Sequence, residues 1–441
     1  MENKLTRRWC ICGMSISLLM VSGQPLAEDA PVAPQGRFTK ILSAGVAYTD
    51  NALNVDVGEA SDLEYFARLN LAFRKDSRRW RAALDYQLSR IEYLENYLQG
   101  KTALTGESSF SLSTNPQRYA WSLDHQQAHT QVDSRAADIQ SNRDVRSILS
   151  TGPDATLRLS PVDQLEGGLR YIETSFRDGL GVDSTRKGGS VLLHHQLSSS
   201  ATVSLGATHL DANIDGFGVD YQRTQFTLGF NGKFRSGEYR LTLGDALIER
   251  DIGEDIDGTY AVLSLVYTGQ SKTFGLLANH ELTDSSVGLS LSTGLGGKFV
   301  NGDENFDKAG IVERTRFQLY YATVGTGDAF DYTLSVQADR EDYVALAEDE
   351  ESLSAALELK YVIAQNMDFK LGMSLMDLRY TDQPLQGEDR IAKVVFALDH
   401  SIDEKLGFRY EVIASSRSND IEFGRDYDKR LVAVSVRYQF D

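Results

Sequence analysis

The end of the chain alternates strictly between apolar and more polar side chains. The apolar positions are Val432, Val434, Val436, Tyr438 and Phe440, and the positions between them are Leu431, Ala433, Ser435, Arg437 and Gln439. A period of two predicts a β-strand with one apolar face and one mixed face. This stretch alone fits either the last strand of a soluble sandwich or the closing strand of a membrane barrel.

The same unit repeats along most of the chain. Leu63 to Phe73 alternates most clearly, Lys75 to Arg78 turns the chain, and Trp80 begins a second alternating run. Further strand pairs follow to the end, each joined by a short turn. The pairs are separated by longer, more acidic connections, which we place at Asn51–Asp62, Leu94–Lys101, His129–Asn142, Arg177–Thr185, Asn213–Asp220, Asp251–Gly258, Thr283–Ala309, Val344–Glu350, Thr381–Glu388 and Arg417–Arg425.

Regular alternation of short and long connections is typical of a membrane barrel and has no reason to occur in a soluble sandwich. The sequence therefore predicts an all-β fold, a single transmembrane antiparallel up-and-down β-barrel of about 20 strands, within a range of roughly 16 to 22. An even count puts both termini on the periplasmic side. Thr283–Ala309 is treated as one external loop, although Val287 to Leu291 also fits a strand extension or a loop folded into the lumen.

Residues 1–27 read as a signal peptide. Lys4, Arg7 and Arg8 precede an apolar run that is too short to span a bilayer, and small residues follow it. We expect residues 28–37 to form a short periplasmic lead and residues 38–441 to form the barrel. Cys10 and Cys12 both lie in the leader, so disulfides and cysteine ligands are excluded from the mature chain. The formal net charge of −18 argues against nucleic acid as a partner.

Several short motifs carry a family resemblance. They are Ala47 to Asn51, Asn142-Arg143, Gly152 to Asp154, and Asp183 to Arg186. With these motifs the chain resembles the outer-membrane β-barrel porins found beside exopolysaccharide and PEP-CTERM sorting genes. The resemblance covers the whole mature chain and implies an outer-membrane barrel linked to polysaccharide export. It implies no catalytic residues.

The sequence shows no clear catalytic or metal-binding pattern. His194 and His195 are adjacent in a strand, so their rings point to opposite faces and cannot share a metal. No serine or threonine is singled out beside an outward histidine, so a lipid or glycan hydrolase is the least favoured alternative. The acidic loops lack the calcium-loop pattern, which leaves solvated loops or weak bridging of divalent ions and lipopolysaccharide. We expect no enzyme activity, no cofactor and no resident metal.

Charged residues on the polar side of the strands are the candidate pore lining. They are Arg68, Arg81, Asp85, Arg158, Glu166, Arg170, Arg314, Arg316, Asp331, Glu358, Lys360, Arg409, Glu411 and Arg437. One interpretation is a salt-bridged lining that stiffens the wall. The other is a selective pore, because charges in a water-filled lumen set selectivity. The excess of basic residues among them suggests weak selection for anionic or polar solutes.

These features predict an outer-membrane porin that passes solutes or takes part in exopolysaccharide export. The alternative is a non-conducting structural or assembly component of a surface polysaccharide system. Expected partners are outer-membrane lipid, lipopolysaccharide, the barrel assembly machinery and polysaccharide export proteins. Tyr438 and Phe440 are the expected assembly signal, although Asp441 moves the terminal aromatic residue one place inward.

Overall fold

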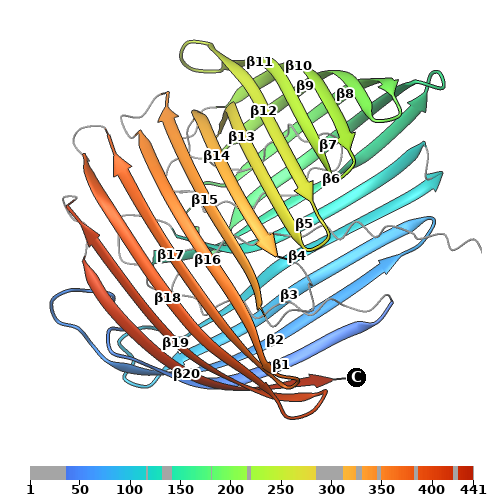
Figure 1. The fold of residues 1–441 in the computed structure, drawn as a ribbon. Coiled ribbons are helices and arrows are strands. Elements are labelled where there is room, and N and C mark those ends of the chain that lie inside the picture. Colours follow the sequence, from blue (N-terminus) through green and yellow to red (C-terminus); the bar gives the residue numbers. More distant parts are fainter. Residues whose placement is uncertain are drawn as a thin grey trace, which may run out of the picture.

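A computed structural model shows a closed antiparallel β-barrel of twenty strands (Figure 1). The structure describes residues 36–115, 118–131, 142–179, 181–215, 220–284, 311–323, 330–344, 349–381, 386–420 and 426–440. Within these ranges no helix is long and apolar enough to cross a membrane. The predicted fold class and strand number are confirmed. The signal peptide and the Val287 to Leu291 segment lie outside the described residues.

The strands are 12 to 16 residues long. The first ten are β1 (Phe38–Thr49), β2 (Asp62–Asp76), β3 (Trp80–Tyr93), β4 (Lys101–Asn115), β5 (Tyr119–Gln131), β6 (Arg143–Arg158), β7 (Asp163–Phe176), β8 (Ser184–Ser198), β9 (Ala201–Ile214) and β10 (Tyr221–Phe234). The others are β11 (Gly237–Arg250), β12 (Ile256–Thr268), β13 (Lys272–Asp284), β14 (Ile311–Thr323), β15 (Phe330–Tyr343), β16 (Glu350–Ala364), β17 (Met367–Tyr380), β18 (Gly387–Ser401), β19 (Leu406–Asn419) and β20 (Tyr427–Phe440).

Each strand pairs with its two sequence neighbours, and β1 pairs with β20 to close the ring. The closing register runs from Lys40 opposite Phe440 to Thr49 opposite Leu431. Closure leaves no edge strand, and this matters in hydrocarbon because each unpaired backbone group there costs several kcal/mol. Phe440 therefore belongs to the seam, where its ring packs edge-on against Tyr438 at 5.0 Å.

The predicted alternation separates the two faces of the wall. On β20, Val432, Val434 and Val436 are 38 to 50% exposed, whereas Leu431 and Ala433 are 6% exposed. The exposed apolar stripes point away from the barrel, and similar stripes occur on the other strands. This outer surface fits hydrocarbon and the opposite, more polar face lines the lumen.

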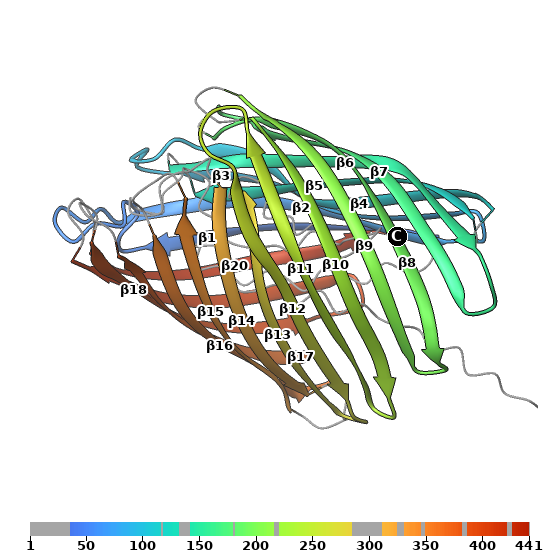
Figure 2. The ribbon, with the colours of Figure 1, turned by 90° about the horizontal axis from the view of Figure 1, so that it is seen from above.

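The two rims differ in the length of their connections (Figure 2). Short turns such as Ser77–Arg79 and Ser199–Ser200 join strands at one rim, and the longer connections lie at the other. Both ends of the described barrel, Phe38 and Phe440, lie at the short-turn rim. In one short turn, Asp403 accepts backbone hydrogen bonds from Lys405 and Leu406, both at 2.7 Å. The bonds from Leu406 and Lys405 hold the pKa of Asp403 below its ordinary value.

The strands extend farther toward the long-loop rim than their apolar alternation predicts. His129, Asn213, Thr283 and Arg417 were assigned to connections but lie in β5, β9, β13 and β19. The reason is that alternation of apolar residues marks only the part of a strand that faces hydrocarbon. Beyond that level the backbone ladder continues, while the side chains no longer need to be apolar.

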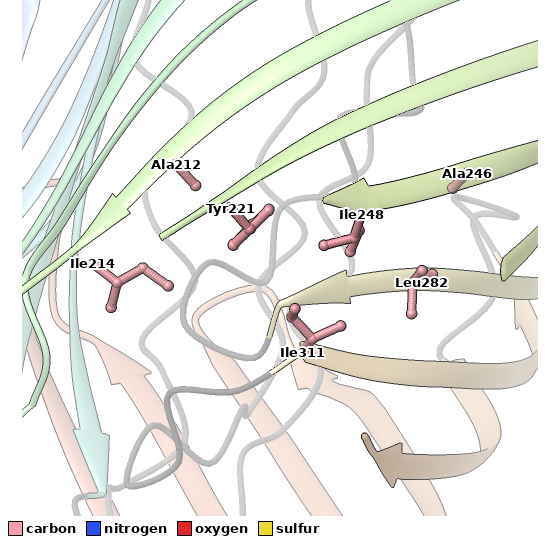
Figure 3. Packing of buried hydrophobic residues seen from close by; sticks show 7 residues of the cluster. All are labelled: Ala212, Ile214, Tyr221, Ala246, Ile248, Leu282 and Ile311. Carbon is pink, nitrogen blue, oxygen red and sulfur yellow. The ribbon is translucent and has the colours of Figure 1, made fainter. Parts of the chain in front are cut away.

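An apolar cluster fills part of the barrel near the long-loop rim (Figure 3). Its members come from β9, β10, β11, β13 and β14, and they are Ala212, Ile214, Tyr221, Ala246, Ile248, Leu282 and Ile311. Ile248 and Ala212 are fully buried although they lie on the inner face. Burial of these apolar side chains away from water stabilises this part of the barrel through the hydrophobic effect. This sector of the long-loop end is therefore filled with side chains.

Candidate functional site: the charged lumen wall

The strand register places all fourteen predicted lining residues on the face opposite the apolar stripes. On β2, for example, Arg68 alternates with Ala67 and Leu69, and Leu69 pairs with the outward Leu42 and Leu88. The same parity holds on the other strands. Their position on the lumen face follows from the fold. Their role in transport stays a prediction.

Two predicted arginines on β14 form ion pairs with acids on β15. Arg316 Nε lies 2.5 Å from Asp339 Oδ1, and Arg314 Nε lies 2.7 Å from Glu341 Oε1. Each arginine lies directly opposite its acid in the antiparallel register, since Arg316 pairs with Asp339 and Arg314 with Glu341. Cross-strand pairs of opposite charge stabilise a sheet. Here they support the interpretation of a salt-bridged wall.

A four-residue charge square lies on β16, β17 and β18. In register, Lys360 is opposite Lys370, and Asp368 is opposite Asp399. Each like-charged pair would be destabilising alone, but Lys360 lies 3.3 Å from Asp368 and Lys370 lies 3.4 Å from Asp399. Arg409 Nη1 adds a second cation 3.6 Å from Asp399. The two signs are therefore interleaved.

A polar cavity of about 220 Å³ opens beside this charge square at the short-turn end. It is lined by Lys360, Lys370, Asp368, Asp399 and Arg437, together with polar residues of the nearby turn. Arg437 comes from β20, so the cavity joins the last strand to β16–β18. The cavity is large enough for a small hydrated solute and offers it both cations and anions.

The opposite wall carries a second, smaller group of charges. Arg170 Nη2 on β7 lies 2.7 Å from Asp154 Oδ1 on β6. Glu166 accepts a hydrogen bond from Gln164 at 2.6 Å and lies 3.5 Å from His194 Nε2. His195 faces the other side, where it bonds Asp163 at 2.8 Å, so the two adjacent rings do point to opposite faces.

The other predicted residues are spread along the wall. Arg158 donates to the nearby carbonyls of Ser160 and Pro161, and Arg68 lies 4.5 Å above the Phe66 ring. Glu411 lies 3.6 Å from Arg409 on the same strand. In the register, Arg81 is opposite Ser111, Asp85 opposite Glu107, Asp331 opposite Lys360 and Glu358 opposite Gly372. The fourteen residues thus form no single cluster.

Sequence reasoning missed two buried ion pairs at the long-loop end. Arg186 on β8 holds Asp284 on β13 with two hydrogen bonds of 2.8 and 3.3 Å, and Tyr221 on β10 also donates to Asp284. Four strands separate β8 from β13, so this contact spans the interior of a curved sector. Arg417 and Asp389 form the second pair, at 2.5 and 3.0 Å. Arg417 had been assigned to a loop, which hid its inward position.

The missed acids also change the charge balance of the wall. Asp154, Asp339, Glu341, Asp368 and Asp399 each lie within 3.6 Å of a predicted basic residue. Hairpin register is the signal that could have found them, since most are directly or diagonally opposite a chosen residue. With these five acids included, ten acidic residues stand beside the nine predicted basic ones, so the basic excess suggested by the sequence disappears.

The lumen wall offers ion pairs and hydrogen-bonding groups. In the described part of the chain, no group of three or more histidine, cysteine, aspartate or glutamate residues is arranged to hold a metal. The larger cavity, about 740 Å³, lies on the outer face between β4 and β10 and is lined mainly by carbon atoms, so it is not part of the lumen. The charged wall is suited to contact a passing polar solute.

Comparisons with known proteins concern the barrel shape alone. No family model and no curated protein matches the sequence, so the resemblance to exopolysaccharide-associated porins stays a prediction. Among solved structures, the chain is similar to the FrpB iron transporter of Neisseria meningitidis (9% identity, TM-score 0.45, covering 92% of this chain and 83% of that chain). It is also similar to the siderophore receptor PirA of Pseudomonas aeruginosa (10%, 0.45, 93% and 81%) and to OccAB4 of Acinetobacter baumannii (13%, 0.40, 92% and 99%). At these values the likeness gives no information about function.

Proposed function

We propose that the protein is an outer-membrane channel for small polar solutes. One observation carries the proposal: a closed barrel of twenty strands has exposed apolar stripes outside and paired charges on its inner wall. An apolar outer belt fits a bilayer. Charged groups in a water-filled lumen can form hydrogen bonds with a polar solute in place of those that it makes to water. We place the short-turn rim in the periplasm and the long connections at the cell surface, as is usual for such barrels.

We propose that selectivity is weak. Acids next to the basic residues cancel much of the field that a purely basic wall would produce, as in the charge square around Lys370 and Asp399. Planar-bilayer recording of the purified protein tests both proposals. We expect stepwise conductance and a reversal potential close to zero in a salt gradient. A folded protein that never conducts, or that stays in solution without detergent, would contradict the channel.

A second candidate is a non-conducting component of a surface polysaccharide system. The filled sector at the long-loop end, with Ile248 fully buried and Arg186 bonded across to Asp284, favours it, because such packing narrows the lumen. The resemblance to porins found beside exopolysaccharide genes supports either a conducting or a scaffolding role in export. Absence of conductance together with retained capture of polysaccharide export proteins would favour the scaffold.

A further inference from the structure

Four polar side chains form a continuous hydrogen-bonded chain on the outer face. His125 Nε2 on β5 lies 2.9 Å from Ser147 Oγ on β6. His125 Nδ1 is bonded to the Tyr86 hydroxyl of β3, and the two rings are stacked with centroids 5.9 Å apart. The Tyr86 hydroxyl also lies 3.4 Å from Ser108 Oγ on β4. Sequence reasoning had singled out no such outward serine–histidine pair.

A glycine lets these residues meet across three strands. Tyr86 and His125 belong to strands that are not neighbours, and Gly106 of β4 stands between Tyr86 and Gln127 in the register. Gly106 has a φ of +141°, and a Cβ there would lie 2.1 Å from the Asp85 carbonyl oxygen and 2.6 Å from the Tyr86 Cα. Only glycine fits this backbone. Its missing side chain leaves room for the Tyr86 ring to cross β4 and reach His125.

The hydrogen bonds permit the tautomer of His125 that a general base requires. The Tyr86 hydroxyl can donate its proton to Ser108 and accept the Nδ1 proton of His125. Nε2 is then the unprotonated nitrogen, and it faces the hydroxyl proton of Ser147. This is the order of roles in nucleophilic catalysis, in which a base that is oriented by a third group activates a serine. Gln127 lies directly opposite Ser147 on the same face, within reach of an oxyanion formed there.

The chain of polar groups lies where the outer face changes from apolar to charged. Leu149, two residues from Ser147, is opposite the exposed Glu173, and the exposed Lys187 and Asp211 stand opposite each other on the next strands. On the other side, Leu123 and Trp121 continue the apolar stripe of β5. Charged residues mark the headgroup level of a membrane protein. Ser147 therefore lies near the depth at which the ester bonds of a lipid join its headgroup to its acyl chains.

The apolar outer cavity begins below this level. Its lining includes Trp121, Pro153, Gly167, Ala207 and Phe226, and its volume is about 740 Å³. Trp121 donates from Nε1 to Thr151 Oγ1 at 2.9 Å, so its polar atom is satisfied within the wall. Trp121 precedes His125 by four residues, which corresponds to about 13 Å along a strand. An acyl chain attached to an ester at Ser147 would reach this cavity.

We propose that the outer face carries a serine esterase site for membrane lipids, independent of the lumen. Ser147 Oγ attacks the ester carbonyl carbon while His125 Nε2 takes the hydroxyl proton. The C–O bond of the ester then breaks, His125 returns that proton to the departing alcohol, and the acyl group stays on Ser147. Water next attacks the acyl-enzyme with His125 as base, which releases a fatty acid and restores Ser147. One ester and one water thus give one acid and one alcohol.

Two other outward histidines differ from His125 in their contacts. His209 bonds Thr224 through Nδ1 at 3.0 Å, and His280 bonds Thr315 through Nδ1 at 2.9 Å, with Glu313 3.1 Å from Nε2. In both, a threonine occupies the nitrogen that the orienting group holds in the Ser147 site. His280 is therefore a matched control: it is an outward histidine bonded to a hydroxyl, and it lies outside the proposed site.

The first experiment uses the folded protein in detergent micelles and in phosphatidylethanolamine vesicles, from a host strain without its own outer-membrane phospholipase. A fluorophosphonate probe should label the protein, and fatty acid should appear. Ser147→Ala should abolish labelling and lower the rate at least about 100-fold, with His125→Asn similar. His280→Asn should retain both. Heat-modifiable gel mobility verifies that each variant is folded. An unlabelled and inactive wild-type protein, or an active folded Ser147→Ala, would overturn the proposal.

The second experiment separates the roles of Tyr86 and of the cavity. Tyr86 is a positioning residue, so Tyr86→Phe should lower kcat and leave KM unchanged. Gly167→Leu should fill the cavity, since a Cβ there meets nothing closer than the Ser190 carbonyl at 3.7 Å, and should raise KM for long-chain esters more than for short-chain esters. Equal effects on all chain lengths would refute the acyl-chain assignment. Ser147→Ala should leave channel conductance unchanged, so the esterase and the channel can fail separately.

Discussion

The buried contact between β8 and β13 gives the most demanding test of the fold. The side chains of Arg186 and Asp284 are 1% and 4% exposed, and Tyr221 shares the same carboxylate. Asp284→Ala leaves a guanidinium and a hydroxyl without this acceptor in a sector closed to water. Breaking a buried ion pair by removal of one partner costs about 3–5 kcal/mol. We therefore expect a loss of about that size in the free energy of unfolding.

Urea titration of the protein in phospholipid vesicles measures this loss, with tryptophan emission from Trp80 and Trp121 as the signal. At an m-value of about 1–3 kcal/mol per molar urea, the midpoint should fall by at least about 1 M. Asp342→Ala is the matched control, because Asp342 pairs at 3.0 Å with an Arg340 side chain that is 59% exposed. Loss of such a pair costs about 0–1 kcal/mol.

A double variant separates the burial of charge from loss of packing. Arg186→Met combined with Asp284→Leu replaces both charges with apolar side chains beside Tyr221 and its apolar neighbours. Replacement of a buried pair by apolar residues is often neutral, so the double variant should be more stable than Asp284→Ala alone. If the stability of Asp284→Ala lies within about 1 kcal/mol of the wild type, the ion pair is solvated and water enters this sector.

The remaining predictions concern Gly106 of β4, the last strand and the charge square. Gly106→Ala should destabilise the barrel by about 1–3 kcal/mol, because its φ of +141° disfavours a side chain and a Cβ would meet the Asp85 carbonyl; the urea midpoint reports it. Phe440→Ala should impair membrane insertion, and normal heat-modifiable mobility of that variant would count against an assembly signal at the seam with Lys40. Lys360→Gln with Lys370→Gln leaves Asp368 and Asp399 in excess, so the reversal potential should shift toward cations; an unchanged potential would place the solute path elsewhere.

The barrel could be predicted because every second residue of each strand faces hydrocarbon and must be apolar. The stripe from Val432 to Phe440, repeated in the other strands, follows from the contact of one face with hydrocarbon, and closure then follows from the backbone. Strand ends could not be predicted in the same way. His129 and Arg417 lie in parts of strands that face no hydrocarbon. There the backbone hydrogen bonds between strands continue, but the side chains need not alternate between apolar and polar.

For the charged wall, the sequence predicts which charged residues face the lumen, but it does not predict which of them form ion pairs. Parity placed Arg316 and Lys360 on the inner face, yet their partners Asp339 and Asp368 depend on register between strands. The contact of Arg186 with Asp284 depends on the curvature of six consecutive strands, which no local pattern records. On the outer face, the meeting of Tyr86 with His125 depends on the empty space above Gly106. These contacts are properties of the closed sheet.

The filled sector connects stability with permeability. Arg186 on β8 and Asp284 on β13 draw two distant parts of the wall together over the cluster around Ile248. If this contact narrows the solute path, Asp284→Ala should lower the urea midpoint and also raise single-channel conductance, because the two strands are no longer held together. Destabilisation with unchanged conductance would mean that solutes pass along the charged wall of β14–β20 without meeting this sector. The two measurements on this one variant therefore show both how much the ion pair stabilises the barrel and whether the solute path passes this sector.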